Sequence, residues 1–289
     1  MRIYILGING MLGSELFLRF NENTKILTRG SVRKGCIKNF KKFHNKIDFN
    51  ISAFDIKKIK YKIQKFKPNY VINCIGLVKQ KIKKKTKTSD IFFINSIFPF
   101  QIYKITKSLN IKLIHFSTDC IFDGKSGNYN EKSIPNAKDL YGLSKYLGEL
   151  KGDKVLTLRT SIIGHEVGSN KYGLLDWFLA QKKCFGYVNS FFSGLTTFEI
   201  FNFINKYVSN RNQKVFGIYN LSSRKISKYS LLKKIAKTYK KKILIKKDFK
   251  IRLNRTLNST QIKKKILYSP PNWKQMLNDM YEKNKFLTN

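Results

Sequence analysis

The fold class is decided by the N-terminal stretch Arg2-Ile-Tyr-Ile-Leu6, which runs directly into Gly7-Ile-Asn-Gly-Met-Leu-Gly13. Its first five residues are the short apolar run of a buried strand, and the segment 11–20 has apolar residues at helical spacing. A Gly-x-x-Gly-x-x-Gly turn between a strand and a helix is the context that a dinucleotide-binding fingerprint requires. The glycines allow a tight turn and let the backbone approach a pyrophosphate resting at the helix N-terminus. The sequence therefore predicts a dinucleotide-binding α/β unit.

A second strand, expected at 25–28, bears on which dinucleotide is bound. Sites that prefer NAD place an acidic residue near the end of this strand, where it holds the ribose 2′-hydroxyl. Here Thr28 and Arg29 occupy that position, Arg33 and Lys34 follow, and no acidic residue lies near. Basic side chains accommodate a 2′-phosphate, so the sequence favours NADPH, with NADH as the alternative.

Strands and helices alternate along the first part of the chain. Further strands are expected at 46–49, 70–74, 112–116 and 154–159, with helices at 53–66, capped by Ser52, and at 91–109, bent or restarted at Pro99. This β-α-β order predicts a doubly wound, mostly parallel, Rossmann-like α/β sheet. The lysine-rich run 79–87 is expected to be a solvated loop, with a phosphate-attracting rim as the alternative.

The pattern changes after Gly164, where a smaller C-terminal lobe is expected. Short helices are predicted at 174–181, at 197–208 and from a Ser227 cap to Tyr239, followed by a short strand at 243–245 and a last helix after Pro270-Pro271. A strand at 216–221 is expected to return to the main sheet. We therefore expect a cofactor-binding domain at 1–164, joined by 215–225, and a substrate-binding lobe at 165–289.

The charge balance is unusual, with 58 basic residues and a formal net charge of +41. Such a charge raises nucleic acid or an anionic membrane surface as partners. However, only nine of the basic residues are arginines, which phosphate and base recognition favour, and the lysines are spread along the chain. We interpret them as solvated side chains on helix faces that attract polyanionic substrates, and we expect no nucleic-acid partner.

Several classes of protein are disfavoured by what the sequence lacks. No segment approaches the ~18 uncharged apolar residues of a membrane span, and the N-terminal strand does not resemble a signal peptide. The four cysteines are scattered without paired spacing, which suits reduced thiols, and no metal-ligand spacing is present. A cytoplasmic enzyme without a metal is expected, and a homodimer is compatible with the sequence.

A candidate catalytic constellation follows the strand at 112–116. Thr118 lies where this strand ends, and the carboxyl ends of strands are where open α/β sheets bind ligands. Tyr141 and Lys145 are four residues apart and share one face of an expected helix. A neighbouring ammonium is expected to lower the pKa of the Tyr141 phenol, which would make it a proton donor to a carbonyl oxygen that Thr118 also contacts.

The chain resembles the extended short-chain dehydrogenases/reductases and, among them, the dTDP-4-dehydrorhamnose reductase-like enzymes that act on nucleotide sugars. The resemblance covers nearly the whole chain. It rests on five segments in a characteristic order: Gly7-x-x-Gly10-x-x-Gly13, Ser117-Thr-Asp-Cys-Ile-Phe-Asp-Gly124, Tyr141-Gly-x-Ser-Lys145-x-x-Gly-Glu149, Arg159-Thr-Ser161 and Phe192-Ser-Gly-Leu-Thr-Thr197.

The resemblance implies a catalytic trio of Thr118, Tyr141 and Lys145. Tyr141 would protonate a C4 ketone as the nicotinamide delivers hydride, while Lys145 would hold the nicotinamide ribose. It further implies a cofactor site made of Gly7, Asn9, Gly10, Met11, Leu12, Gly13, Arg29, Asp48, Phe49, Asn73, Cys74, Ile75, Gly76, Asn95, Tyr141 and Lys145. The implied substrate pocket contains Val78, Asp119, Cys120, Ser161, Trp177, Phe192 and Thr196.

Cys120 bears on which reaction is expected. The related 4,6-dehydratases carry an acidic or lysine residue at this position, so a cysteine favours plain reduction. GDP-fucose synthases, which epimerise before they reduce, do place a cysteine here with a nearby histidine, and His165 falls close to the matching position. The simpler interpretation is that Cys120 is a small buried residue, as free cysteines commonly are.

The resemblance therefore predicts NADPH-dependent reduction of a nucleotide-linked 4-keto-6-deoxyhexose, for surface polysaccharide or deoxysugar synthesis. Two alternatives stay open, a bifunctional epimerase-reductase and a non-catalytic regulatory subunit that keeps the cofactor site.

Overall fold

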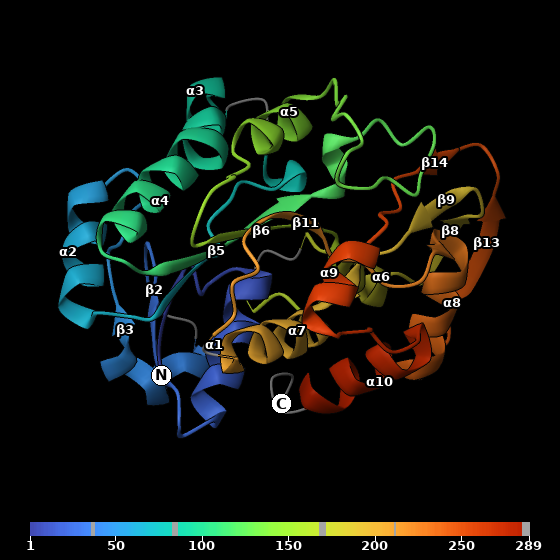
Figure 1. Ribbon diagram of the computed structural model, residues 1–289. Helices are drawn as coiled ribbons and strands as arrows, with labels where there is room; N and C mark the ends of the chain where they lie inside the picture. Colours follow the sequence, from blue (N-terminus) through green and yellow to red (C-terminus); the bar gives the residue numbers. More distant parts are fainter. Residues whose placement is uncertain (36–37, 83–85, 168–171, 211, 285–289) are drawn as a thin grey trace.

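The computed structural model describes residues 1–35, 38–82, 86–167, 172–210 and 212–284. Its centre is a seven-stranded sheet in which every pairing is parallel (Figure 1). The strand order is β11 (Gly217–Asn220), β6 (Val155–Thr160), β5 (Lys112–Thr118), β4 (Tyr70–Asn73), β1 (Arg2–Leu6), β2 (Leu27–Ser31) and β3 (Ile47–Asp48). The order reverses between β1 and β4, which is the crevice where doubly wound sheets bind ligands. This confirms the Rossmann-like fold.

Helices cover both faces of the sheet, and the N-terminal strand shows why. Ile3 and Ile5 belong to the core cluster that contains α1 (Met11–Glu22) and α7 (Thr197–Ser209). Tyr4 and Leu6 belong to the opposite cluster, under α2 (Ile56–Phe66) and α4 (Phe98–Ser108). Because alternate residues of a strand point to opposite faces, a strand covered on both sides must be apolar throughout.

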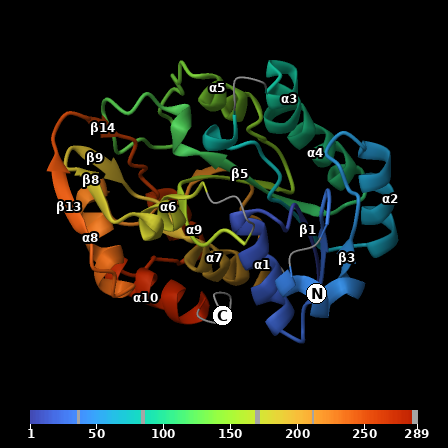
Figure 2. The same ribbon diagram turned by 180° about the vertical axis from the view of Figure 1, so that it is seen from behind.

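The smaller lobe lies at one end of the sheet in both views (Figures 1 and 2). Its helices are α6 (Leu174–Ala180), α8 (Lys228–Thr238), α9 (Thr260–Ile266) and α10 (Trp273–Asn284). Its strands are β7 (Ile162–Ile163), β8 (Lys183–Tyr187), β9 (Ser190–Phe192), β10 (Leu195–Thr196), β12 (Ile226–Ser227), β13 (Leu244–Asp248) and β14 (Leu253–Asn254). The segment 217–220 leaves this lobe and pairs with β6 as the last strand of the main sheet.

Two expected boundaries differ from the structure. The helix expected after Ser52 begins at Ile56, since the Asp55 carboxylate accepts the Lys58 N–H at 3.0 Å and caps it. The strand expected at 25–28 is β2, which extends to Ser31 alongside Leu6 of β1. Arg29 therefore lies inside the strand rather than at its end.

The helix expected at 91–109 is built in three parts. It starts with α3 (Thr88–Phe92), passes through a π-helical turn at Phe93–Ile97 and continues as α4. Such turns occur often at functional sites, and this one carries Asn95. Of the lysine-rich run, Lys79–Lys81 form a 3₁₀ turn, and 83–85 lie outside the described residues.

Within the described ranges, no helix is long and apolar enough to cross a membrane. The same ranges contain no group of three or more His, Cys, Asp and Glu side chains that could hold a metal ion. Cys74, Cys120 and Cys184 are free thiols, and Cys36 falls outside the described residues.

Candidate active site

The glycine turn closes tightly at the carboxyl end of β1. Gly7 has φ +83°, a conformation that glycine adopts without strain. A Cβ on Gly13 would lie 2.4 Å from the Gly7 carbonyl oxygen, so only glycine lets α1 pack this closely against the turn. A Cβ on Gly10 would meet only that same oxygen, at 3.4 Å, which leaves the outer side of the turn open. The turn thus presents an accessible helix N-terminus, as pyrophosphate binding requires.

The structure brings Thr118, Tyr141 and Lys145 together. Thr118 is the last residue of β5, and the other two lie on α5 (Leu140–Leu147). Tyr141 lies near enough to Thr118 for the Thr118 side chain to lower the pKa of the phenol, and the Lys145 Nζ donates to the Phe116 carbonyl oxygen of β5 at 2.7 Å. Lys145 also lies beside Gly76, since a Cβ on that residue would lie 4.0 Å from the Lys145 Nζ.

Two local features hold α5 against β5. The Asp139 carboxylate caps the helix by accepting the Gly142 N–H at 2.9 Å. Gly142 packs onto the turn that follows Thr118, where an added Cβ would lie 2.3 Å from the Cys120 carbonyl oxygen. The close approach of backbone to backbone fixes the distance between Tyr141 and Thr118.

The electrostatics of the trio differ from the sequence expectation. Burial lowers the pKa of Lys145 to about 8, against an opposing effect of Glu149. Burial also raises the pKa of Tyr141, and the negative charges near it add to that rise. Only the neighbouring Thr118 side chain lowers the Tyr141 pKa, because the Lys145 ammonium is bonded to the Phe116 carbonyl instead. The expected lowering by Lys145 was wrong: Tyr141 stays a protonated phenol at neutral pH.

Asn95 ties the loop that follows β4 to α5. Its Oδ1 accepts the Leu77 N–H at 2.9 Å, and its Nδ2 donates to the Leu77 carbonyl at 3.0 Å and to the Ser144 hydroxyl at 3.1 Å. Gly76 lies beside this amide, where an added Cβ would be 3.6 Å from Oδ1. Asn95 thereby positions the loop that carries Gly76 and Val78, the latter 39 % exposed.

The start of the same loop is ordered by hydrogen bonds from β4. The Asn73 Oδ1 accepts the Ile75 N–H at 3.1 Å, and its Nδ2 lies 3.2 Å from the Nδ1 of buried His115. Burial raises the pKa of the Cys74 thiol beyond its usual range, so this cysteine is an inert packing residue.

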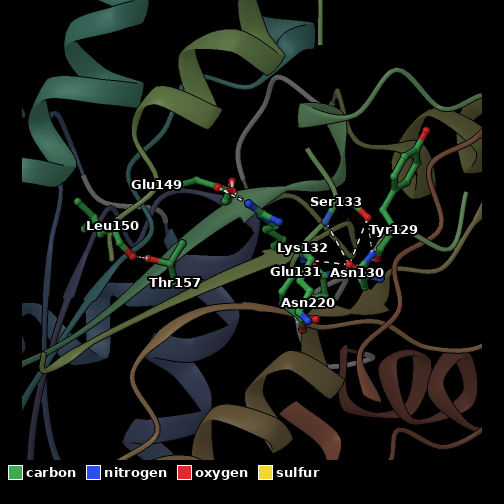
Figure 3. A network of polar contacts seen from close by, with 11 residues as sticks. Tyr129, Asn130, Glu131, Lys132, Ser133, Glu149, Leu150, Thr157 and Asn220 are labelled. Carbon is green, nitrogen blue, oxygen red and sulfur yellow. Dashed lines mark hydrogen bonds and ion pairs between the residues drawn. The ribbon is translucent and has the colours of Figure 1, made fainter. Parts of the chain in front are cut away.

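A buried ion pair at the end of α5 was not predicted from the sequence. The Arg159 Nε and Nη2 donate to Glu149 at 2.8 and 2.7 Å, and the Ser117 hydroxyl donates to the same carboxylate at 2.7 Å (Figure 3). These contacts fasten α5 to β5 and β6. The family motif contains Glu149 and Arg159, but their pairing needs the two strands side by side.

Figure 3 also shows how the returning strand supports the loop before α5. The Asn220 Nδ2 donates to the Tyr129 carbonyl at 2.8 Å, and the Asn220 N–H donates to the Glu131 carboxylate at 3.1 Å. The loop is therefore held by a residue about ninety positions later in the chain.

Asp48, expected near the adenine, is the centre of a charged cluster. Its carboxylate accepts from the Tyr4 hydroxyl at 2.9 Å and pairs with Arg29 at 3.0 Å and Lys62 at 2.8 Å. Arg29 is thus already paired with a carboxylate, which it shares with Lys62.

The other two basic residues of this region are placed differently. Arg33 and Lys34 are exposed just beyond β2. The Asn9 side chain of the glycine turn donates to the Lys34 carbonyl at 3.3 Å, which holds this segment beside the turn.

Three of the residues expected around the substrate, Asp119, Cys120 and Phe192, lie near two cations that the sequence had not singled out. Arg255 donates from Nη1 to the Cys120 Sγ at 3.5 Å and from Nε to the Phe122 carbonyl at 2.8 Å. The Lys228 Nζ lies 4.7 Å from the centre of the Phe192 ring. Burial lowers the pKa of Lys228, while the nearby Asp119 and Cys120 oppose that shift.

The remaining expected substrate residues have varied surroundings. Trp177 is 42 % exposed on α6, and the Ser161 carbonyl accepts the Leu195 N–H at 3.0 Å. Thr196 is buried and caps α7 by accepting the Glu199 N–H at 3.2 Å. The structure thus explains the Thr196 side chain without a ligand.

Cys120 and His165 have different partners. The His165 Nε2 lies 2.8 Å from the Tyr239 hydroxyl and its Nδ1 lies 3.6 Å from the Asp176 carboxylate. Burial raises the pKa of the Cys120 thiol to about 12, so the thiol is not ionised at neutral pH. This arrangement favours the interpretation of Cys120 as a packing residue.

A Rossmann-like sheet with a glycine turn at its first crossover, and a Thr-Tyr-Lys set at the end of β5, defines an extended short-chain dehydrogenase/reductase. Residues 1–286 match the family model described as "RmlD substrate binding domain". The chain belongs to this family.

Solved structures of similar fold agree with this assignment. A hypothetical dTDP-4-dehydrorhamnose reductase from Sulfolobus tokodaii is 25% identical, with a TM-score of 0.73 over 91% of this chain and 94% of that one. A dTDP-4-dehydrorhamnose reductase from Bacillus anthracis, in complex with NADP, is 19% identical, with a TM-score of 0.78 over 98% and 99% of the two chains. A dTDP-glucose 4,6-dehydratase from Bacillus anthracis, in complex with NAD, has a TM-score of 0.76 at 16% identity over 99% and 98%.

The curated relatives are named as subunits of another enzyme and not as reductases. Methionine adenosyltransferase 2 subunit beta from Xenopus tropicalis is 28% identical over 148 residues, and the protein of that name from Bos taurus is 25% identical over 148 residues. Each match covers 51% of this chain and 41% of the relative, so it spans less than half the length of those proteins.

Proposed function

We propose that this protein uses NADPH to reduce the C4 ketone of a nucleotide-linked 4-keto-6-deoxyhexose, as a step in deoxysugar or surface polysaccharide synthesis. The observation that carries the proposal is the contact of Tyr141 with Thr118 beside the buried Lys145, at the edge of the sheet where the glycine turn opens. The family and its reductases support the substrate class.

The residues present fit a bound dinucleotide. The open side of Gly10 and the uncrowded Gly76 leave room for a ligand between the turn and the Lys145 ammonium. Arg33 and Lys34, exposed beyond β2, are the residues we propose for the 2′-phosphate, since Arg29 is paired with Asp48. When NADPH is bound, its nicotinamide supplies the hydride.

The chain's own groups supply the proton and stabilise the charge. Tyr141 remains protonated because burial raises its pKa, so its hydroxyl can donate to the ketone oxygen. Thr118, whose side chain already lowers the Tyr141 pKa, stabilises the phenolate that forms by donating its hydroxyl. Lys145, carrying a proton below about pH 8, is placed to bond a ribose hydroxyl on the side of Gly76.

The substrate would lie where Asp119, Cys120 and Phe192 face the second lobe. Lys228 and Arg255, which approach the same three residues from that lobe, are placed to neutralise a sugar-nucleotide diphosphate. The reaction would then take place between the two parts of the chain.

The test is NADPH oxidation, followed by absorbance, with a panel of dTDP-, UDP- and GDP-linked 4-keto-6-deoxysugars. Turnover of one sugar is expected, and Tyr141→Phe should lower kcat on the order of 10²- to 10⁴-fold because it removes the proton donor. Tyr146→Phe is the matched control, since this half-exposed tyrosine lies on the same helix. Turnover that survives Tyr141→Phe would refute the assigned role.

Cofactor choice has a separate test. Arg33→Ala with Lys34→Ala should weaken NADPH binding roughly tenfold or more, through loss of charge-assisted contacts, and leave NADH binding unchanged. Equal weakening of both cofactors would contradict the assignment of the 2′-phosphate site.

A non-catalytic subunit is the second candidate, favoured by the curated relatives named as subunits of methionine adenosyltransferase. It predicts NADPH binding without turnover of any sugar in the panel. That result would overturn the reductase proposal and leave the cofactor site intact.

A further inference from the structure

The two-stranded sheet formed by β8 and β13 has one face that nothing in the described chain covers. Its inner face packs on the core through Cys184 and Ile245, and Gly186 lies against Tyr229 of α8. The parallel register pairs Phe185 with Lys246 and Lys183 with Leu244, so these four side chains share the outer face. Figures 1 and 2 both show this sheet at the rim of the molecule, away from the main sheet.

The outer face exposes large apolar side chains. Phe185 is 60 % exposed and Leu244 is 59 % exposed. Tyr187 is 39 % exposed on the same strand as Phe185. Single exposed apolar residues are ordinary, but several on adjacent strands mark a surface that contacts something.

The charges on this face are mainly positive. Lys183 and Lys246 are exposed among the apolar side chains, and Asp248 is the acidic group beside them. We name the set Phe185, Tyr187, Leu244, Lys183 and Lys246 the lysine–aromatic face. Aromatic and aliphatic side chains mixed with lysine, whose stem lies along apolar surface while its ammonium reaches outward, suit the boundary between acyl chains and anionic headgroups.

The charge of this face distinguishes between the partners that could bind it. A second copy of this chain would bring Lys183 and Lys246 against a protein that itself carries a net charge of +41. Nucleic-acid recognition favours arginine, and neither strand of this sheet contains one. An anionic bilayer satisfies both the apolar and the cationic side chains, because lysine is attracted to the surface potential of acidic lipids.

We propose that the lysine–aromatic face binds the surface of an anionic membrane, without any segment crossing it. The apolar side chains enter the headgroup region, and the lysines select acidic lipids. The active-site edge of the sheet is not part of this face. The inference is therefore independent of the proposed reaction.

The experiment is flotation of the full chain with vesicles of phosphatidylcholine alone or of phosphatidylcholine and phosphatidylglycerol in equal parts. Binding is expected only to the acidic vesicles and should decline with added salt. The double variant Phe185→Ser/Leu244→Ser should reduce partitioning on the order of tenfold. Lys183→Gln/Lys246→Gln should reduce it more than about tenfold, at roughly fivefold per lysine near an acidic surface.

Matched controls lie on the opposite side of the molecule, on β2 and α2 (Figure 1). Leu27 and Tyr61 are 51 % and 57 % exposed, so Leu27→Ser/Tyr61→Ser removes comparable apolar surface. Lys57→Gln/Lys60→Gln removes the same charge from exposed positions of α2. Both control variants should bind vesicles as the unchanged protein does, and circular dichroism checks that every variant is folded.

Three results would overturn the proposal. One is absence of binding to acidic vesicles. Another is equal loss of binding in the control variants, which would indicate diffuse attraction by the net charge. The third is that the protein associates with itself or binds single-stranded RNA in place of vesicles, and that Phe185→Ser/Leu244→Ser abolishes this association or RNA binding. That outcome would assign the face to a second copy or to nucleic acid.

Discussion

Truncation of Glu149 should destabilise the fold severely, although the residue lies outside the catalytic trio. Its carboxylate accepts from Arg159 twice and from Ser117 once, at 2.7 to 2.8 Å. The side chains of Arg159 and Glu149 are only 5% and 3% exposed. Glu149→Ala would leave the guanidinium buried, with the Phe122 ring 5.6 Å away as its remaining partner of note.

The magnitude follows from burial. Removing one member of a buried ion pair costs about 3–5 kcal/mol, because the other charge stays desolvated without compensation. That is a large part of the roughly 5–15 kcal/mol by which domains are stable. Replacing both partners by apolar residues, as in Glu149→Leu/Arg159→Met, should recover most of the loss, since no buried charge is left.

Urea unfolding followed by circular dichroism measures these differences. The control is the exposed pair of Lys107 and Asp153, 2.9 Å apart with side chains 55% and 60% exposed. Asp153→Ala should change the free energy of unfolding little, because exposed ion pairs are screened by solvent. The reasoning fails if Glu149→Ala is as mild as Asp153→Ala, or if the double variant is as unstable as Glu149→Ala.

Two further predictions concern α5. Burial lowers the pKa of Lys145 from 10.5 to about 8, so between these two pH values the unfolded chain binds more protons than the folded protein. The buried ammonium therefore destabilises the fold fully below pH 8, and this destabilisation disappears toward pH 10.5. At pH 7, Lys145→Met should therefore have a free energy of unfolding about 2–3 kcal/mol larger than that of the unchanged protein, as measured by urea unfolding, and it should lose turnover. This difference in free energy should disappear by pH 10.5. A difference that is independent of pH would contradict the prediction. Gly142→Ala should lower kcat more than it weakens NADPH binding, because its Cβ would push α5 away from the Cys120 carbonyl, 2.3 Å distant; unchanged kcat would show that α5 is not positioned by this contact.

The placement of the candidate site was predictable because its signals are local. The spacing of Gly7, Gly10 and Gly13 sets a turn within seven residues, and the apolar run before Thr118 predicts a strand that ends there. Lys145 follows Tyr141 by one helical turn and so shares its face. Each inference depends on the backbone near the residue concerned.

The energetics of the same site were not predictable in this way. The Tyr141 pKa was expected to be lowered, yet burial raises it, because the Lys145 ammonium bonds to the Phe116 carbonyl of a neighbouring strand. Arg29 looked free to meet a phosphate, but it pairs with Asp48, which is nineteen residues away in sequence. A pKa depends on burial and on charges brought near by folding.

By itself, the sequence determined the class of sheet, the glycine turn and the order in which Thr118, Tyr141 and Lys145 appear, since these follow from periodicity and short-range sterics. Only the tertiary structure decided which charged side chains are paired within the protein and which stay available to bind a ligand. Arg255 reaches Cys120 from 135 residues away, and the exposed face of β8 and β13 exists only because two distant segments pair in one register. Contacts between distant segments depend on how the whole chain packs, and no local pattern encodes them.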